Sequence, residues 1–246
     1  MFYIVVLFCI AFAAGLLAFY IPKYNAKNYK LLLVFAGSYL FSITILHILP
    51  DLFHSSMNGE LIGIFILAGF FLQQVLEYLS NGVEHGHVHI HQHHDKHRNA
   101  SSLLVLGALF VHAFLEGSLL VKSNGIDQNQ DSSVLFWGIA LHKAPEAFAL
   151  MSVLLCEVKN RGKAVFYLLI FAMATPAGLF LSNYLMVNDQ IPVLGFTILF
   201  ALVAGSFLHI STTIVFESSP EHKFNGKKMA VAIAGALVSI VAEYLI

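Results

Sequence analysis

The chain has 246 residues, of which 58% are hydrophobic and 11% are charged, and its mean hydropathy is +0.78. Soluble domains have about 45–50% apolar and about 25% charged residues, so this composition excludes a soluble protein and predicts a membrane protein. A net charge of −1 gives no electrostatic basis for binding nucleic acid. The two cysteines, Cys9 and Cys156, lie far apart in apolar runs, which excludes a disulfide-stapled fold and a thiolate zinc motif.

Eight apolar runs are long enough to cross a bilayer, whose hydrocarbon core of about 30 Å needs about 20 apolar residues per helix. Polar residues, glycine, proline and asparagine separate these runs. The predicted spans are Phe2–Ile21, Lys30–Leu52, Leu61–Leu79, Ser101–Val121, Ser133–Cys156, Lys163–Met186, Ile191–Phe216 and Lys228–Leu245. They predict an all-α integral membrane protein with one transmembrane domain over residues 1–246.

Basic residues predict the orientation, because Lys and Arg in short loops stay preferentially on the cytoplasmic side. Of the 13 basic residues, 11 fall around the segments that follow the first, third, fifth and seventh runs: Lys23, Lys27, Lys30, Lys96, Arg98, Lys159, Arg161, Lys163, Lys223, Lys227 and Lys228. The opposite set of loops has Lys122, and Lys143 lies inside the fifth run. We therefore expect both termini outside the cytoplasm, in a cell membrane such as a bacterial inner membrane or a plasma membrane.

Two His–Glu pairs lie near the middle of the fourth and fifth runs. His112 and Glu116, like His142 and Glu146, are four residues apart and share one helix face. Charged groups at membrane depth cost about 2.5–3.5 kcal/mol each on insertion scales, so they indicate function. Because consecutive spans are antiparallel, the four side chains can converge on one Zn²⁺ ion, or on Fe²⁺, Mn²⁺ or Cd²⁺. Hydrogen-bonded helix packing without a ligand is the competing interpretation.

Other polar residues in the apolar runs add candidate features around these pairs. Pro145 cannot donate a backbone hydrogen bond, so we expect a bend that frees the Leu141 carbonyl. Candidate relay ligands outside and inside the central pairs are His47, Asp51 and His209, with weaker support for Glu217 and Glu221. The alternative is that these relay candidates are polar residues at helix ends that face lipid headgroups.

Seven histidines fall in one polar segment, at about 81–100: His85, His87, His89, His91, His93, His94 and His97. Such a tract cannot form an apolar core, and it is typical of a disordered segment with weak, multivalent metal affinity. The predicted orientation puts it on the cytoplasmic side, where it would buffer metal or regulate transport.

Together these motifs resemble the ZIP (Zrt/Irt-like) family of divalent metal transporters. The paired motifs are His112-Ala113-Phe114-Leu115-Glu116-Gly117 and His142-Lys143-Ala144-Pro145-Glu146, and residues 37–51, 174–178 and 204–208 are similar to the family's second, sixth and seventh helices. The resemblance implies eight transmembrane helices, with spans one to three and six to eight as inverted repeats around spans four and five. It also implies that metal moves toward the cytoplasm.

The chain departs from the family at a second metal position that many members have. Ala113, Lys143 and Thr175 stand there, and the first and third offer little or nothing to a dication. We therefore predict a single metal site, with Lys143 as a tethered substitute for the second ion. An equally supported interpretation is that Lys143 only offsets buried acid.

The leading hypothesis is a transporter, not an enzyme, that imports Zn²⁺ or a related divalent metal by alternating access. Its partners would be the metal ion and the lipid bilayer, without an organic cofactor. The alternatives are an intramembrane zinc metallohydrolase, for which no His-Glu-x-x-His run is present, and a membrane metal sensor or buffer. The preferred metal, the coupling ion and the oligomeric state, for which a homodimer is one option, are left open.

Overall fold

The computed structural model describes residues 2–20, 26–80, 102–121, 132–158, 160–188, 190, 192–217 and 226–245. These ranges are helical almost throughout and contain no strand. The helices are α1 (Phe2–Leu17), α2 (Ala26–Ile43), α3 (Leu49–His54), α4 (Gly59–Ser80), α5 (Ser102–Ser118), α6 (Ser132–Glu157), α7 (Arg161–Val187), α8 (Val193–Glu217) and α9 (Gly226–Leu245), and the π-helical segment η1 (Thr44–Ile48) joins α2 to α3. The histidine-rich segment lies outside the described residues.

Each predicted apolar run coincides with one continuous helical segment, because α2, η1 and α3 follow one another without a break. Pro50 accounts for η1, since its ring crowds the carbonyl of Leu46 one turn earlier and offers it no N–H. A wider π turn accommodates this crowding without ending the helix.

Five helical segments of the described chain are long and apolar enough to span a membrane: Lys30–His54, Gly59–Ser80, Val134–Leu155, Arg161–Val187 and Val193–Val215. Helices α1 and α5 are apolar but shorter. The prediction of an all-α membrane protein is confirmed. The total of eight spans and the inverted repeats stay predictions.

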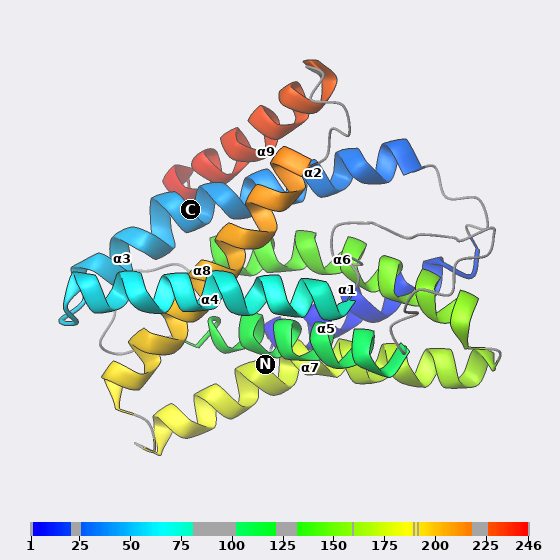
Figure 1. Cartoon of the computed structure of the whole chain (residues 1–246), viewed down its shortest axis with the longest axis horizontal. Coiled ribbons are helices and arrows are strands. Elements are labelled where there is room, and N and C mark those ends of the chain that lie inside the picture. Colours follow the sequence, from blue (N-terminus) through cyan, green and yellow to red (C-terminus); the bar gives the residue numbers. More distant parts are fainter. Residues whose placement is uncertain are drawn as a thin grey trace.

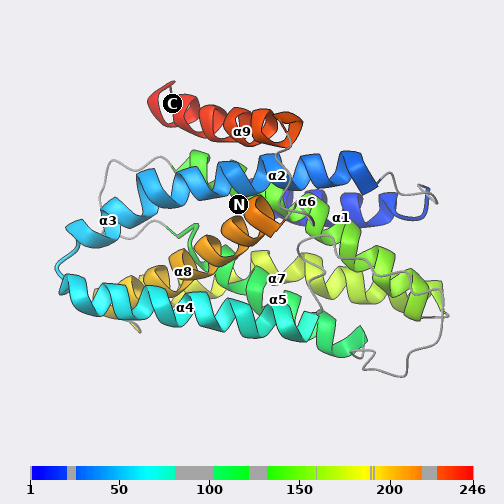
Figure 2. The same ribbon diagram turned by 45° about the horizontal axis from the view of Figure 1, so that its top comes forward.

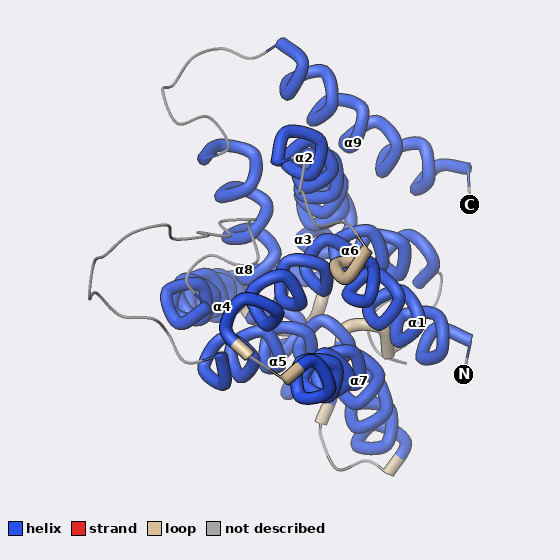
Figure 3. The backbone as a smooth tube through the Cα atoms, turned by 90° about the vertical axis from the view of Figure 1, so that its right-hand side faces the viewer, coloured by secondary structure: helices blue, strands red, loops and turns tan. Residues whose placement is uncertain are grey.

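The contacts between helices divide the bundle into two groups. Figures 1 and 2 show the arrangement of the helices from two directions. In one group α5 packs along α7, and α1 contacts α6 and α7. In the other, α4 packs along α8, and α2 lies against α8 and α9, with α9 at the edge of the bundle (Figure 3). The two groups meet where α4 contacts α5 and where α2 contacts α6. At the contact between α2 and α6, the Tyr39 hydroxyl donates a hydrogen bond to the Val134 carbonyl.

Glycines allow the closest helix pairs to approach backbone to backbone. A Cβ atom on Gly117 of α5 or on Gly178 of α7 would collide with a carbonyl of the opposite helix. Gly69 of α4 and Gly205 of α8 face each other's helices in the same way. Because lipid removes the hydrophobic drive for helix association, such close packing holds membrane helices together. These two contacts fix α5 and α4, which supply two sides of the site described next.

Candidate metal centre

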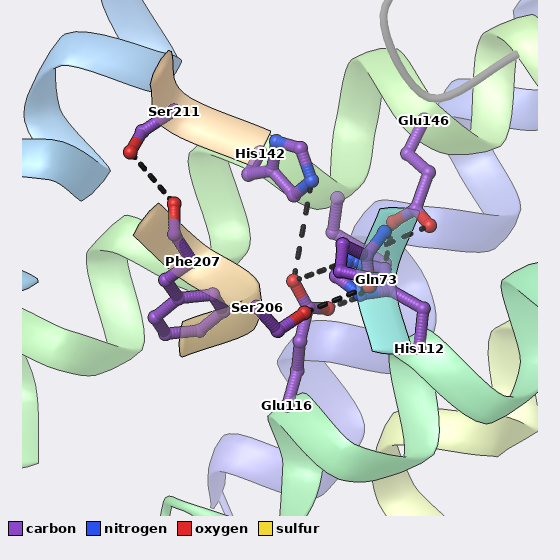
Figure 4. A network of polar contacts seen from close by, with 9 residues as sticks. Gln73, His112, Glu116, His142, Glu146, Ser206, Phe207 and Ser211 are labelled. Carbon is purple, nitrogen blue, oxygen red and sulfur yellow. Dashed lines mark hydrogen bonds and ion pairs between the residues drawn. The ribbon is translucent and has the colours of Figure 1, made fainter. Parts of the chain in front are cut away.

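The four side chains that we predicted to bind metal lie together between α5 and α6 (Figure 4). Each is buried, with at most 1% of its surface exposed. His112 Nε2 lies 3.0 Å from Glu116 Oε1 and 4.0 Å from Glu146 Oε1. His142 Nε2 lies 4.0 Å from the same Glu116 oxygen. The two helices thus bring both His–Glu pairs to one depth.

Three of these residues form the most compact set of potential ligands in the described chain. One ligand atom each from His112, His142 and Glu146 lies within 4.8 Å of the others. Ligand atoms at about 2.0–2.2 Å from zinc in a tetrahedral site are about 3.3–3.6 Å apart, so a small contraction would close this set around an ion. Glu116 reaches both imidazoles and offers a fourth oxygen. Two imidazoles with carboxylates suit a borderline dication such as Zn²⁺.

Lys143 connects the two carboxylates of the site. Its Nζ lies 2.5 Å from Glu116 Oε2 and 2.8 Å from Glu146 Oε2, and 5.0 Å from the centre of the Phe171 ring. The lysine is 1% exposed. One ammonium group against two carboxylates leaves the site with one formal negative charge when the imidazoles are neutral. Lys143 therefore already neutralises part of the charge that a cation would meet.

The other two residues at the second metal position considered above offer an ion little or nothing. Ala113 is fully buried and has no ligand atom in its side chain. Thr175 is 2% exposed, and its hydroxyl has no hydrogen-bond partner within the residues that the structure describes. Helix α6 continues through Pro145 as one helix, so the bend predicted there does not interrupt it.

Two polar residues that the sequence analysis missed form hydrogen bonds on the Nδ1 side of His112. Gln73 of α4 accepts a hydrogen bond at its Oε1 from His112 Nδ1, at 3.1 Å, and another from Ser206 Oγ of α8, at 2.7 Å (Figure 4). Gln73 is 1% and Ser206 4% exposed. The signal available in the sequence for Gln73 was a short group of polar residues, Gln73, Gln74 and Glu77, near the end of a long apolar run.

The relay candidates lie outside the compact ligand set. His209 of α8 pairs with Glu77 of α4, with 2.6 Å between Nε2 and Oε2, and its ring packs edge-on against Phe70. This pair lies about one helical turn beyond Gln73 and Ser206, on the side predicted to face the cytoplasm. His47 belongs to η1 and Asp51 to α3, and both are partly buried. Glu217 is the last residue of α8, and Glu221 falls outside the described part of the chain.

Comparison with known proteins gives consistent matches. A family model described as ZIP zinc transporter matches residues 76–242. Zinc transporter ZIP9-A of Xenopus laevis is 31% identical over 171 residues, which cover 66% of this chain and 54% of that protein. Zinc transporter ZIP9 of Micropogonias undulatus is 32% identical over 163 residues, covering 63% of this chain and 50% of that protein. The chain thus spans about half the length of the curated relatives that it matches. Because the family model covers most of the chain, including both His–Glu pairs, the chain belongs to the ZIP zinc transporter family.

Proposed function

We propose that this protein imports Zn²⁺, or a related divalent metal, into the cytoplasm by alternating access through the site between α5 and α6. The observation that carries the proposal is the convergence of His112, Glu116, His142 and Glu146, all buried, from two neighbouring helices. Buried carboxylates repel each other at membrane depth, and a dication would offset that cost. The zinc transporters among the relatives support the same assignment.

We further propose that the site holds one metal ion and that Lys143 substitutes for a second. Its ammonium group lies within 2.8 Å of both carboxylates, which supports this role. With the ammonium present, a bound dication brings the formal charge of the site to +1. Without it, the same ion would give a neutral and more tightly held complex. Lys143 would therefore weaken metal binding and favour release.

The proposed path continues on either side of the central site. His47 and Asp51 would collect the ion from outside, and His209 with Glu77 would receive it on the cytoplasmic side. The distribution of Lys and Arg supports this assignment of the two sides, with both termini outside a cell membrane. The histidine-rich segment would buffer delivered metal.

The metallohydrolase and the metal sensor or buffer are the competing functions. A hydrolase needs a water position and a general base beside its zinc. In the proposed site Glu116 and Glu146 are both paired with Lys143, which leaves neither as a ready base. A sensor would bind metal without moving it across a membrane.

Metal uptake by proteoliposomes tests the function. We expect the purified chain to carry Zn²⁺ into vesicles, with Cd²⁺, Fe²⁺ and Mn²⁺ compared under the same gradient. Glu116→Gln should abolish most of the flux, while Glu60→Gln, which alters an exposed carboxylate on α4, should leave it unchanged. Metal binding without uptake by the unmodified protein would favour the sensor and refute the transporter.

A further inference from the structure

The amide of Gln73 reaches the metal centre from a third helix. It is buried, and its Oε1 atom receives hydrogen bonds from His112 Nδ1 at 3.1 Å and from Ser206 Oγ at 2.7 Å. The contact joins α4 and α8 of one helix group to α5 of the other. Neither Gln73 nor Ser206 belongs to the proposed ligand set, so metal ligation alone does not account for these hydrogen bonds.

The hydrogen bond to Gln73 determines which imidazole nitrogen of His112 can bind a metal. An amide oxygen can only accept a hydrogen bond, so the imidazole nitrogen that faces it, Nδ1, has the hydrogen atom. In a neutral imidazole the other nitrogen, Nε2, then has the lone pair. Nε2 is the atom that lies 3.0 Å from Glu116 Oε1 and 4.0 Å from Glu146 Oε1. A carboxylate oxygen at 3.0 Å from this nitrogen needs a proton on it, and a bound metal ion would take the place of that proton.

Ser206 anchors the amide group of Gln73. Its hydroxyl donates to the same oxygen of Gln73 that His112 uses. A flipped amide would present its NH₂ group to Nδ1, which would move the imidazole hydrogen to Nε2 and block the ligand atom. The hydroxyl of Ser206 could accept a hydrogen bond from the turned amide, so it anchors Gln73 in either orientation, and the orientation with the oxygen toward Nδ1 is the one in which Nε2 can bind metal.

We propose that Gln73 is a positioning residue of the metal centre, which presents Nε2 of His112 to the ion, and that Ser206 anchors its amide group. The proposal rests on the metal-transport function proposed above. Outer partners of this kind typically change metal affinity by about 10–100-fold when they are removed. A packing role alone would predict that any side chain of similar volume serves as well.

Four variants of the full chain in detergent separate these roles. Gln73→Leu keeps the volume but removes the acceptor, Gln73→Glu keeps an oxygen acceptor, and Ser206→Ala removes the donor to it. Gln74→Leu changes an exposed glutamine on the same helix and is the matched control. The measurements are the Zn²⁺ dissociation constant, by competition with a chelating dye, and the visible spectrum of bound Co²⁺. The site signal is the part that His142→Ala abolishes, because other histidines also bind metal.

We expect Gln73→Leu to raise the dissociation constant about 10–100-fold and to change the Co²⁺ spectrum. Gln73→Glu should restore most of the affinity, Ser206→Ala should weaken binding less than Gln73→Leu does, and Gln74→Leu should match the unmodified chain. Equal binding by Gln73→Leu and Gln74→Leu, or equal weakness of Gln73→Leu and Gln73→Glu, would overturn the proposal. If Gln73→Leu does not fold, unchanged binding by Ser206→Ala overturns the anchoring role. Failure of His142→Ala to reduce binding would instead refute the metal site itself.

Discussion

Replacing Lys143 with methionine removes the ammonium group from the site at nearly constant volume. The ammonium lies 2.5 Å from one carboxylate oxygen and 2.8 Å from another, all of them buried. Loss of one partner from a buried ion pair costs about 3–5 kcal/mol, so the metal-free variant should be less stable by at least that amount. Thermal melting of the purified chain without metal measures this loss.

The same substitution should increase metal affinity. Unit charges 4 Å apart interact by about 4 kcal/mol at an effective dielectric constant of 20, and a dication feels twice the repulsion from a nearby ammonium. Since about 1.4 kcal/mol corresponds to tenfold in affinity, we expect Lys143→Met to bind Zn²⁺ at least tenfold more tightly. Zinc should accordingly raise the melting temperature more in the variant than in the unmodified chain.

Lys163→Met, which changes an exposed lysine at the start of α7, is the control and should alter neither quantity. The reasoning is wrong if Lys143→Met melts like the control without metal, or if its zinc affinity is unchanged or weaker. A second zinc ion at the central site of the unmodified chain would also contradict the role of Lys143.

Three further substitutions test the packing and the proposed path. Gly205→Ala should lower the free energy of unfolding by about 1–3 kcal/mol, because the added Cβ would collide with the backbone of α4. Gly63→Ala is the control, because its Cβ would meet open space, and thermal melting compares the two variants. His209→Ala should slow uptake at saturating zinc with little change in the dissociation constant, because it removes an imidazole ligand on the release side. A large loss of affinity would argue against a release role. Asp51→Asn should raise KM for zinc uptake and leave the maximal rate nearly unchanged, and an unchanged KM would remove Asp51 from the path.

The sequence predicted the helical segments well because the apolar runs and their polar separators follow directly from bilayer thickness. It also predicted the convergence of the two His–Glu pairs, since the i and i+4 spacing fixes a shared face on each helix. The contact of Lys143 with Glu146 follows from its i and i+3 spacing, but its contact with Glu116 depends on how α5 and α6 pack.

Contacts between segments that are far apart along the chain could not be predicted from the sequence alone. Gln73 reaches His112 across 39 positions, and Ser206 reaches Gln73 across 133. Helical periodicity orders residues around one helix but does not say which helix lies beside it. The pairing of α4 with α8 depends on mutual glycine contacts, which a single sequence does not match to each other. The π-helical turn before Pro50 was also missed, because proline alone predicts a disturbed helix rather than the way in which it is relieved.

The initial rate of Zn²⁺ uptake by proteoliposomes containing the His142→Ala variant tests the central proposal most directly. His142 is buried and supplies an imidazole to the compact ligand set, so its loss should reduce uptake to the level of protein-free vesicles. Melting of the variant without metal, compared with the unmodified chain, would establish that it remains folded. A folded His142→Ala protein that carries zinc at the unmodified rate would contradict transport through the site between α5 and α6.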